Sequence, residues 1–483
     1  MPYSQIIALM LALLIVVDAP VDINPFMSAW SVAAFWLLKA TAFALLVFRL
    51  AGNKKIGSIG LLQEKLQWLS LFALAIDFYV FDLKIFIAHL IAWPTPGLVN
   101  ICSLGFYLIY LIMAWAACWL GLKKRGLATI SIQDEIDLRL RLVLPAIIPY
   151  LAVTLAGDII GRVQWPGFND FINSAAGEAI SVTIAFITII VFVPLMIKFI
   201  WRCKPIPKGH VRDLIEGFLR RSGLKYREIL LWSLDGQRLC TAAVLGVIPS
   251  FRYILLTPCL IQNLTPEEIE AVLAHESAHV RRRHMLWYLV FIGIYSLIFY
   301  RLFDAVWIWL VSQRPFLRAI FDLRDAPPGI VSLLSSLPLG LALVLYFRFL
   351  MGYFMRNFER EADLAVFDAQ GRPWHLINAL EKLALISGGI RNQPSWHHYS
   401  IAQRVEFLQD VAQNPSLKTA FLKKLRQKKA LFLLVASFLT LLPGLLPVKS
   451  WEAIARRNLT QFYLEQPSNH GKARPKSNNP ELD

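Results

Sequence analysis

Nine long apolar stretches limit the possible folds of this chain more than any other feature of its sequence. They fall at 4–17, 28–50, 66–92, 97–122, 142–160, 179–201, 286–311, 329–351 and 430–448. Each is long enough, or nearly so, to cross the roughly 30 Å hydrocarbon core of a bilayer as a helix. Hydrophobic residues make up 57% of the 483 residues, which exceeds what a soluble domain carries. We therefore predict a mainly α-helical, polytopic membrane protein with about nine spans.

Lysine and arginine gather in alternate loops, and this distribution predicts the orientation of the spans. Basic residues cluster at 54–65 and 123–141, whereas the loops on either side of these two carry almost none. The basic loops and the region after Trp201 are therefore expected on the cytoplasmic side, in a bacterial cytoplasmic membrane. The same loops explain the net charge of +16. Because no nucleic-acid-binding motif accompanies that charge, the lipid bilayer is the expected partner and nucleic acid is not.

The strongest chemical signal is the sequence His-Glu-Ser-Ala-His at 275–279. On a helix, His275 and His279 project from one face, which suits two ligands of a single tetrahedral zinc ion. Glu276 then lies beside the metal without binding it, in the place of a general base. The motif predicts a hydrolytic zinc site with one zinc ion per chain.

The helix that carries this motif has a well-marked start. Thr265 is a favourable N-cap, Pro266 fits the first helical position, and Glu268 completes a capping box. Leu264 and Ile269 stand where a hydrophobic staple would pack. The two histidines are therefore expected well inside regular helix.

Two histidines need a third protein ligand, and Glu359 is the best candidate. Asp363 follows four residues later on the same helical face, where it could accept a hydrogen bond from a ligand histidine. His275 and Glu359 can meet only on one side of the membrane, which requires an even number of spans between them. The stretches at 286–311 and 329–351 supply two.

The region between Trp201 and His275 is typical of a small α+β unit. An amphipathic helical pattern covers 211–219, and three apolar runs predict strands, with Asp235-Gly236 as a hairpin turn between the first two: Glu228–Leu234, Cys240–Val247 and Tyr253–Leu256. The five cysteines are scattered without CxxC spacing, which argues against a disulfide framework and against thiolate ligands for zinc.

These motifs together resemble the integral-membrane zinc metalloproteases that include HtpX and the type-1 CAAX prenyl endopeptidase. The resemblance covers about 205–410 and rests on LTPEEIEAVLAHESAHVRRRH, a two-span hairpin, and MRNFEREAD at 355–363. In the second motif Met355 replaces a serine of the family and Arg360 replaces an aromatic residue. The resemblance implies a gluzincin-type metalloprotease domain that the hairpin splits in two.

It also implies roles for residues outside the two motifs. His398 would help to stabilise the oxyanion, with Arg404 nearby, although Tyr399 stands where the family usually has proline and His397 is an adjacent competitor. Substrate would bind at an edge strand around Thr241 and Ala242, where the family has asparagine followed by alanine.

The expected domain organisation follows from the spans and the motifs. Residues 1–201 form an N-terminal membrane domain of about six spans, whose first stretch is interpreted as retained rather than as a cleaved signal peptide. The remaining parts are a first catalytic part, a transmembrane hairpin, a second catalytic part, a last transmembrane or re-entrant segment, and a disordered tail: 202–285, 286–351, 352–429, 430–448 and 449–483. The tail lies outside if the last segment spans, and in the cytoplasm if it is re-entrant.

The favoured function is a membrane-embedded zinc endopeptidase that cleaves membrane-associated or misfolded proteins. One alternative is a sensor or regulator that uses the protease fold for one dedicated cleavage or for binding only, and a second is CAAX-type processing of prenylated proteins. A transporter-like role is suggested by ionisable residues within apolar stretches, namely Lys39, Asp77, Asp82 and Lys84. Glu361 is expected to be solvated, and His284 is expected at the bilayer edge. The oligomeric state stays open.

Overall fold

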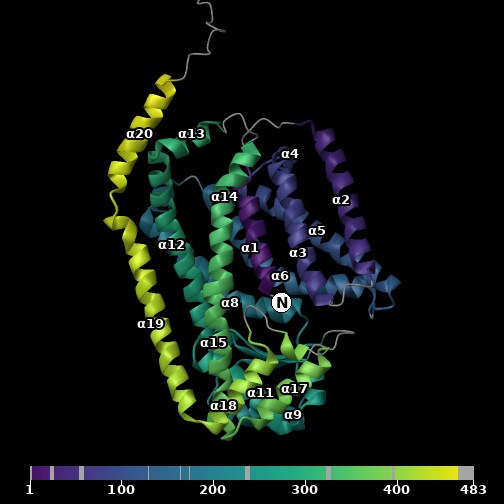
Figure 1. Cartoon of the computed structure of the whole chain (residues 1–483). Coiled ribbons are helices and arrows are strands. Elements are labelled where there is room, and N and C mark those ends of the chain that lie inside the picture. The colour runs from purple at the N-terminus through teal and green to yellow at the C-terminus, as the bar shows by residue number, and fades with distance from the viewer. Residues whose placement is uncertain are drawn as a thin grey trace, which may run out of the picture. The chain divides into compact units, whose positions relative to one another are not determined.

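The protein is described from a computed structural model, which is mainly helical with one small sheet (Figure 1). The described residues are 3–21, 27–53, 59–128, 130–163, 165–172, 174–233, 240–322, 328–388, 390–393 and 398–465. They divide into two compact units, Met1–Phe291 with Pro327–Arg426, and Ile292–Ala326 with Gln427–Asp483.

The N-terminal part of the first unit is a helical bundle with two apolar cores. Its helices are α1 (Tyr3–Asp18), α2 (Ala29–Gly52), α3 (Ile59–Tyr79), α4 (Leu83–Leu90), α5 (Pro96–Lys124), α6 (Ile132–Gly161), α7 (Pro166–Ile172) and α8 (Ala175–Ile200). α5 packs against α2, α3 and α6, so it forms the centre of the bundle.

The apolar stretch at 66–92, which contains Asp77, Asp82 and Lys84, is interrupted between α3 and α4. α3 ends at Tyr79, and Asp82 adopts a left-handed backbone conformation before α4 begins. Lys39 of α2 forms an ion pair with Asp77 of α3, and the Tyr110 hydroxyl donates to the other oxygen of Asp77 at 2.7 Å. Lys84 donates to the Ala19 carbonyl oxygen at 2.8 Å. The bundle thus supplies internal partners to these charged groups, which is what a structural role requires.

Seven described helices are long and apolar enough to cross a membrane, judged by length and composition. They cover Ala29–Gly52, Pro96–Lys124, Ile132–Gly161, Thr183–Ile200, His284–Ser312, Gly329–Gln370 and Ser416–Leu445. α1 is apolar but shorter, and α3 is not among the seven. The count of nine spans therefore stays a prediction.

The sheet of the first unit has four short strands in the order β1-β2-β4-β3. They are β1 (Lys204–Pro205), β2 (Glu228–Leu231), β3 (Ala242–Leu245) and β4 (Tyr253–Leu256), with the 3-10 turn η1 (Pro249–Phe251) between the last two. β2 pairs with β4 in parallel, and β3 pairs with β4 antiparallel. The predicted hairpin between the first two runs is wrong, because β4, buried at all four positions, lies between them. Asp235-Gly236 lies outside the described residues.

One apolar core joins the sheet to helices from both sides of the hairpin. Three helices come before the hairpin: α9 (His210–Arg221), α10 (Pro258–Asn263) and α11 (Pro266–Arg281). The second predicted span, 329–351, ends with η2 (Tyr346–Met351), and the elements after it are α15 (Gly352–Asp363), α16 (Ala365–Gln370), α17 (Trp374–Ile386), η3 (Ile390–Asn392) and α18 (Ile401–Gln413). The core is built from β2, β4, α9, α10, α11, α16, α17 and α18, and it includes Ile215, Ile254, Leu273, Leu380 and Leu408. α9, α11, α17 and α18 gather near the sheet in Figure 1.

The remaining helices are α12 (His284–Ser312), α13 (Arg314–Asp322), α14 (Pro328–Leu345), α19 (Ser416–Leu445) and α20 (Val448–Glu465). In the second unit, α13 meets α20 through Arg314, which donates to Asn458. α20 is a helix where the sequence analysis expected a disordered tail. Residues 466–483 lie outside the described part of the chain.

Candidate metal centre

The helix that holds the two histidines starts as its sequence predicts. The Thr265 hydroxyl accepts from the Glu268 backbone N–H at 3.3 Å, and a Glu268 carboxylate oxygen accepts from the Thr265 N–H at 2.9 Å. Leu264 and Ile269 are both buried. The capping box satisfies backbone donors that the first turn leaves unpaired, and so fixes where α11 begins.

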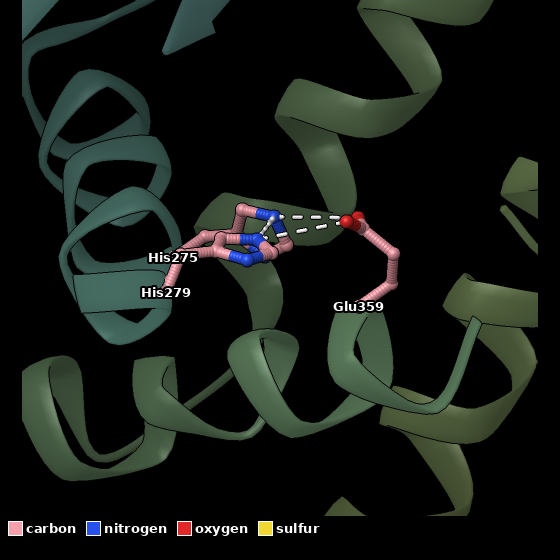
Figure 2. A group of neighbouring side chains, drawn as sticks. All are labelled: His275, His279 and Glu359. Atoms are coloured by element: carbon pink, nitrogen blue, oxygen red, sulfur yellow. Dashed lines mark hydrogen bonds and ion pairs between the residues drawn. The ribbon is translucent and has the colours of Figure 1, made fainter. Parts of the chain in front are cut away.

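Three side chains from α11 and α15 converge on one point (Figure 2). His275 Nε2 and His279 Nε2 are 3.2 Å apart, and they lie 3.5 and 3.6 Å from the two carboxylate oxygens of Glu359. A tetrahedral zinc ion with bonds of about 2.0–2.1 Å separates its ligand atoms by about 3.3 Å. The spacing therefore fits one zinc ion.

The next layer of contacts holds these ligands in place. His275 Nδ1, the ring nitrogen that faces away from the cluster, lies 2.9 Å from Asp363 Oδ1. Arg404 donates to both oxygens of Asp363, at 2.9 and 2.6 Å, and its Nη1 lies 3.8 Å from Glu359. Asp363 is fully buried. The structure thus brings Asp363 and Arg404 to the positions that the sequence analysis predicted.

Glu276 lies between the two histidines and beside the sheet. Burial raises the pKa of its carboxyl group to about 7, and its carboxylate accepts a hydrogen bond from the Val244 backbone N–H. Burial lowers the pKa of His279 to about 3. Burial acts in the same direction on His275, but the carboxylates of Asp363 and Glu359 outweigh it and raise the pKa of His275 to about 10. A metal ligand must be a neutral imidazole, so zinc binding would displace a proton from His275.

His398 lies at the open side of the cluster. Its Nδ1 is 3.2 Å from Glu359 Oε2, and its side chain is 43% exposed. A histidine in this place can reach a group that approaches the metal site from solvent. His397, its competitor in the sequence, lies outside the described residues.

Two departures from the family pattern contact each other. The Arg360 guanidinium lies 3.8 Å from the centre of the Tyr399 ring and 4.7 Å from that of Phe407. Stacking of a guanidinium on an aromatic ring is a favourable cation–π contact. The two replacements, Arg360 for an aromatic residue and Tyr399 for proline, are therefore complementary. Their contact packs α15 against the segment that carries His398.

β3 forms one edge of the sheet and lies against α11. The Thr241 carbonyl oxygen accepts from the Thr257 N–H at 3.1 Å, so its backbone is directed toward β4. Along an antiparallel pair, successive residues point their backbone N–H and C=O groups alternately toward and away from the partner strand. The N–H and C=O groups of Ala242 and Val244 therefore point away from β4. The hydrogen bond from Val244 to Glu276 agrees with this direction. Of the two predicted substrate-binding residues, Ala242 therefore has the outward-facing backbone.

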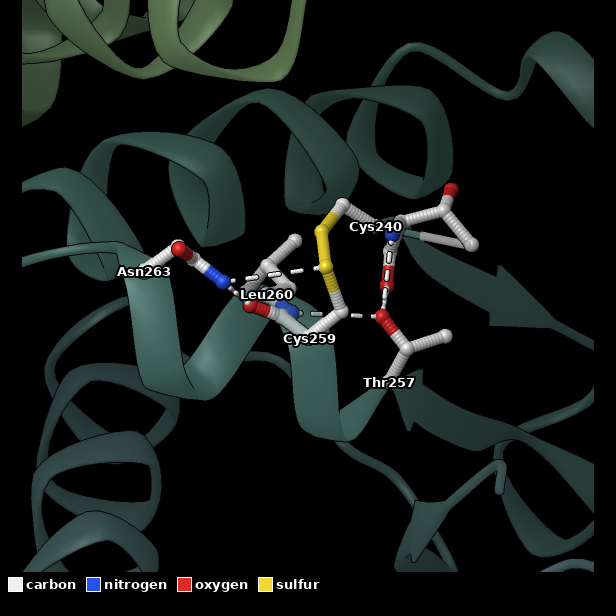
Figure 3. Close-up of a disulfide and its surroundings, with 6 residues drawn as sticks. Cys240, Thr257, Cys259, Leu260 and Asn263 are labelled. Carbon is white, nitrogen blue, oxygen red and sulfur yellow. Dashed lines mark hydrogen bonds between the residues drawn. A yellow bond between two sulfur atoms is a disulfide. The ribbon is translucent and has the colours of Figure 1, made fainter. Parts of the chain in front are cut away.

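Cys240 and Cys259 form a disulfide, with Cα atoms 5.0 Å apart (Figure 3). The sequence analysis argued against a disulfide framework, and for this pair it was wrong. The contacts between Thr241 and Thr257 extend the β3–β4 ladder by one residue, which carries Cys240 to the second residue of α10. The spacing of cysteines along the chain gives no sign of this proximity, since it depends on strand pairing.

The prediction that Glu361 is solvated is wrong, whereas the place of His284 at the bilayer edge stays a prediction, since His284 is the first residue of the apolar helix α12. Both side chains are buried, and His284 Nε2 lies 3.1 Å from Glu361 Oε2. The helical wheel correctly put Glu361 on the face of α15 opposite Asp363, but that face is covered by the start of α12 rather than by solvent.

Residues 205–413 match the model of Peptidase family M48. This segment belongs to that family. The M48 segment runs from β1 to the end of α18, and it contains both halves of the candidate metal centre. This segment and the apolar helices together support an integral membrane protein.

Curated relatives of the M48 segment carry the name Protease HtpX homolog. One from Acidovorax ebreus (strain TPSY) is 26% identical over 179 residues, which are 37% of this chain and 57% of the relative. Another from Polaromonas naphthalenivorans (strain CJ2) is 30% identical over 144 residues, which are 30% of this chain and 48% of the relative. The chain thus spans about half the length of these relatives. Among solved structures, S. mikatae Ste24p aligns with 80% of this chain and 100% of its own, at 17% identity and a TM-score of 0.49.

Proposed function

We propose that the protein is a zinc-dependent endopeptidase that hydrolyses peptide bonds of membrane-associated or misfolded proteins. The observation that carries the proposal is the meeting of His275, His279 and Glu359 at ligand spacing, with Glu276 alongside. This donor set, two imidazoles and a carboxylate, would leave one position of a tetrahedral zinc ion open, as catalytic zinc sites require.

When bound, zinc would acidify a water molecule and polarise the scissile carbonyl group. Glu276 takes a proton from the attacking water and later returns it to the leaving amine. A carboxyl group with a pKa near 7 is suited to both transfers near neutral pH. His398, on the exposed side of Glu359, donates a hydrogen bond to the developing oxyanion.

The substrate binds as an additional strand along β3. Extended peptides commonly add to an exposed sheet edge through backbone hydrogen bonds. Ala242 has an outward-directed backbone, and Val244 directs its N–H to Glu276, so a strand paired here would pass beside the general base.

Ala242→Pro tests this mode of binding. Proline removes the outward N–H without removing a ladder bond to β4, and edge strands tolerate it. We expect KM for casein to rise several-fold with little change in the thermal midpoint. Ala243→Pro is the contrasting variant, because it removes a bond to β4 and should lower the thermal midpoint. An unchanged KM in a folded Ala242→Pro protein would argue against strand addition.

The active site is proposed to face the cytoplasm, on the basis of the lysine and arginine clusters. Cys240 and Cys259 give a direct test, because the cytosol keeps most thiols reduced. The disulfide of the structure would be reduced on the cytoplasmic side, so we expect both thiols to be alkylated in growing cells treated with N-ethylmaleimide before lysis. A Cys240→Ser/Cys259→Ser double variant provides the reference for the other cysteines. A pair that is already bridged in intact cells would place the catalytic part on the opposite, oxidising side.

Membrane proteomics tests the function and separates it from its alternatives. Cells carrying the wild type are compared with cells carrying Glu276→Gln. Fragments of many membrane or misfolded proteins, present only with the wild type, would support general proteolysis. A single cleaved target would favour the dedicated regulator, and a change confined to prenylated proteins would favour CAAX processing. Identical fragment sets would contradict the endopeptidase.

A further inference from the structure

A sharp turn after α11 brings His284 back to the metal centre. α11 ends at Arg281, and Arg283 adopts a left-handed conformation with φ of 57° before α12 begins at His284. On an uninterrupted helix, His284 would lie about 140° around the axis from His279. The turn instead puts the Nδ1 atoms of these two rings 3.0 Å apart.

The environment of His284 is closed on its other sides. Its side chain has no exposed surface, and its ring stacks on Phe358 with centroids 4.4 Å apart and planes 2° from parallel. Its Nε2 lies 3.1 Å from Glu361 Oε2, and the Glu361 side chain is 8% exposed. Packing therefore fixes the His284 ring plane, and both ring nitrogens have a partner.

The protonation that a metal ligand requires determines which atoms donate in the contacts from His279 through His284 to Glu361. A metal ligand must present an unprotonated nitrogen, so His279 Nε2 carries no proton and its Nδ1 carries one. That N–H donates to His284 Nδ1, which must then be the acceptor. The proton of His284 lies on Nε2 and is donated to Glu361. With both imidazoles neutral, this is the one arrangement that places a single proton in each contact.

We propose that His284 and Glu361 act as positioning residues that hold His279 in the tautomer and orientation needed to bind zinc. The inference rests on the proposed metal function. Metal-binding histidines generally donate their other N–H to a carboxylate or a carbonyl group. The Nδ1 of His275 lies 2.9 Å from a carboxylate oxygen of Asp363, with no residue between them. His279 reaches its carboxylate through a second imidazole, so each ligand histidine has its own acidic support on α15.

The test measures zinc affinity by competition with a chelator on the purified full-length protein. His284→Phe keeps the ring that stacks on Phe358 but removes both nitrogens, and Glu361→Gln keeps the side chain's size but removes its charge. Each should weaken zinc binding about 10- to 100-fold, the usual effect of losing such a support. Arg281→Gln, an exposed change on the same turn, is the control and should bind zinc like the wild type.

Two further readouts distinguish positioning from a general loss of stability. If Glu361 acts through His284, the double variant His284→Phe/Glu361→Gln should lose no more zinc affinity than His284→Phe alone. The effects of residues that act through one another on the same ligand are not additive. In the cobalt-substituted protein, the visible absorption bands should shift in His284→Phe but not in Arg281→Gln. Should His284→Phe fail to fold, Glu361→Gln alone decides by the same measurements.

The outcomes separate the two proposals. A wild type that binds no zinc would overturn the proposed function and this inference with it. A wild type that binds zinc, alongside folded His284→Phe and Glu361→Gln proteins of equal affinity, would overturn the inference alone. Additive losses in the double variant would mean that Glu361 does not act through His284.

Discussion

Glu276→Gln should lower kcat for casein cleavage about 10²- to 10⁴-fold, the usual effect of removing a general base. The substitution keeps the size of the side chain and removes the carboxylate that accepts the proton of water. Zinc content should stay at the wild-type level, because Glu276 lies between the ligands on α11 without being one of them. KM should change little, since the loss affects the chemical step rather than substrate capture.

Two comparison variants make this result specific. Glu406→Gln removes an exposed carboxylate of α18 and should leave both cleavage and zinc content unchanged. Asp363→Asn changes the group beside His275 and should cost about 10- to 100-fold in metal affinity or activity. A zinc-loaded Glu276→Gln protein that cleaves casein at a near-normal rate would contradict the mechanism and favour the sensor or regulator.

His275→Ala, His279→Ala and Glu359→Ala should each lose most of the bound zinc. Three protein ligands are the minimum found in catalytic zinc sites, so removal of any one leaves a site with two. Elemental analysis of the purified proteins measures the loss, and wild-type protein treated with a chelator gives the metal-free reference. Full zinc stoichiometry in Glu359→Ala would mean that another residue is the third ligand.

The predictions that rest on local sequence agree well with the structure. The capping box at Thr265 and the four-residue spacing of His275 and His279 depend only on helix geometry, which the sequence states directly. Glu359 was chosen because Asp363 follows it on the same helical face, and the even number of spans between Glu359 and His275 agreed with that choice. The three side chains do meet in the structure, although their role as ligands stays a prediction.

The errors concern features that depend on tertiary packing. The order of the strands could not be read from the chain, because β4 lies between two strands that precede it in sequence. The pairing of Cys240 with Cys259 follows from that order. The contacts of His284 could not be predicted either, because a left-handed residue at Arg283 redirects the chain, and non-glycine residues adopt this conformation rarely.

A zinc titration of the metal-free protein tests the central claim most directly. Wild-type protein is stripped with a chelator, purified in detergent and given increasing zinc, while casein cleavage is followed on the same samples. The account predicts no cleavage without metal and full cleavage at one zinc per chain, with Glu276→Gln binding the same zinc and cleaving almost nothing. Cleavage that persists after complete removal of the metal would contradict it.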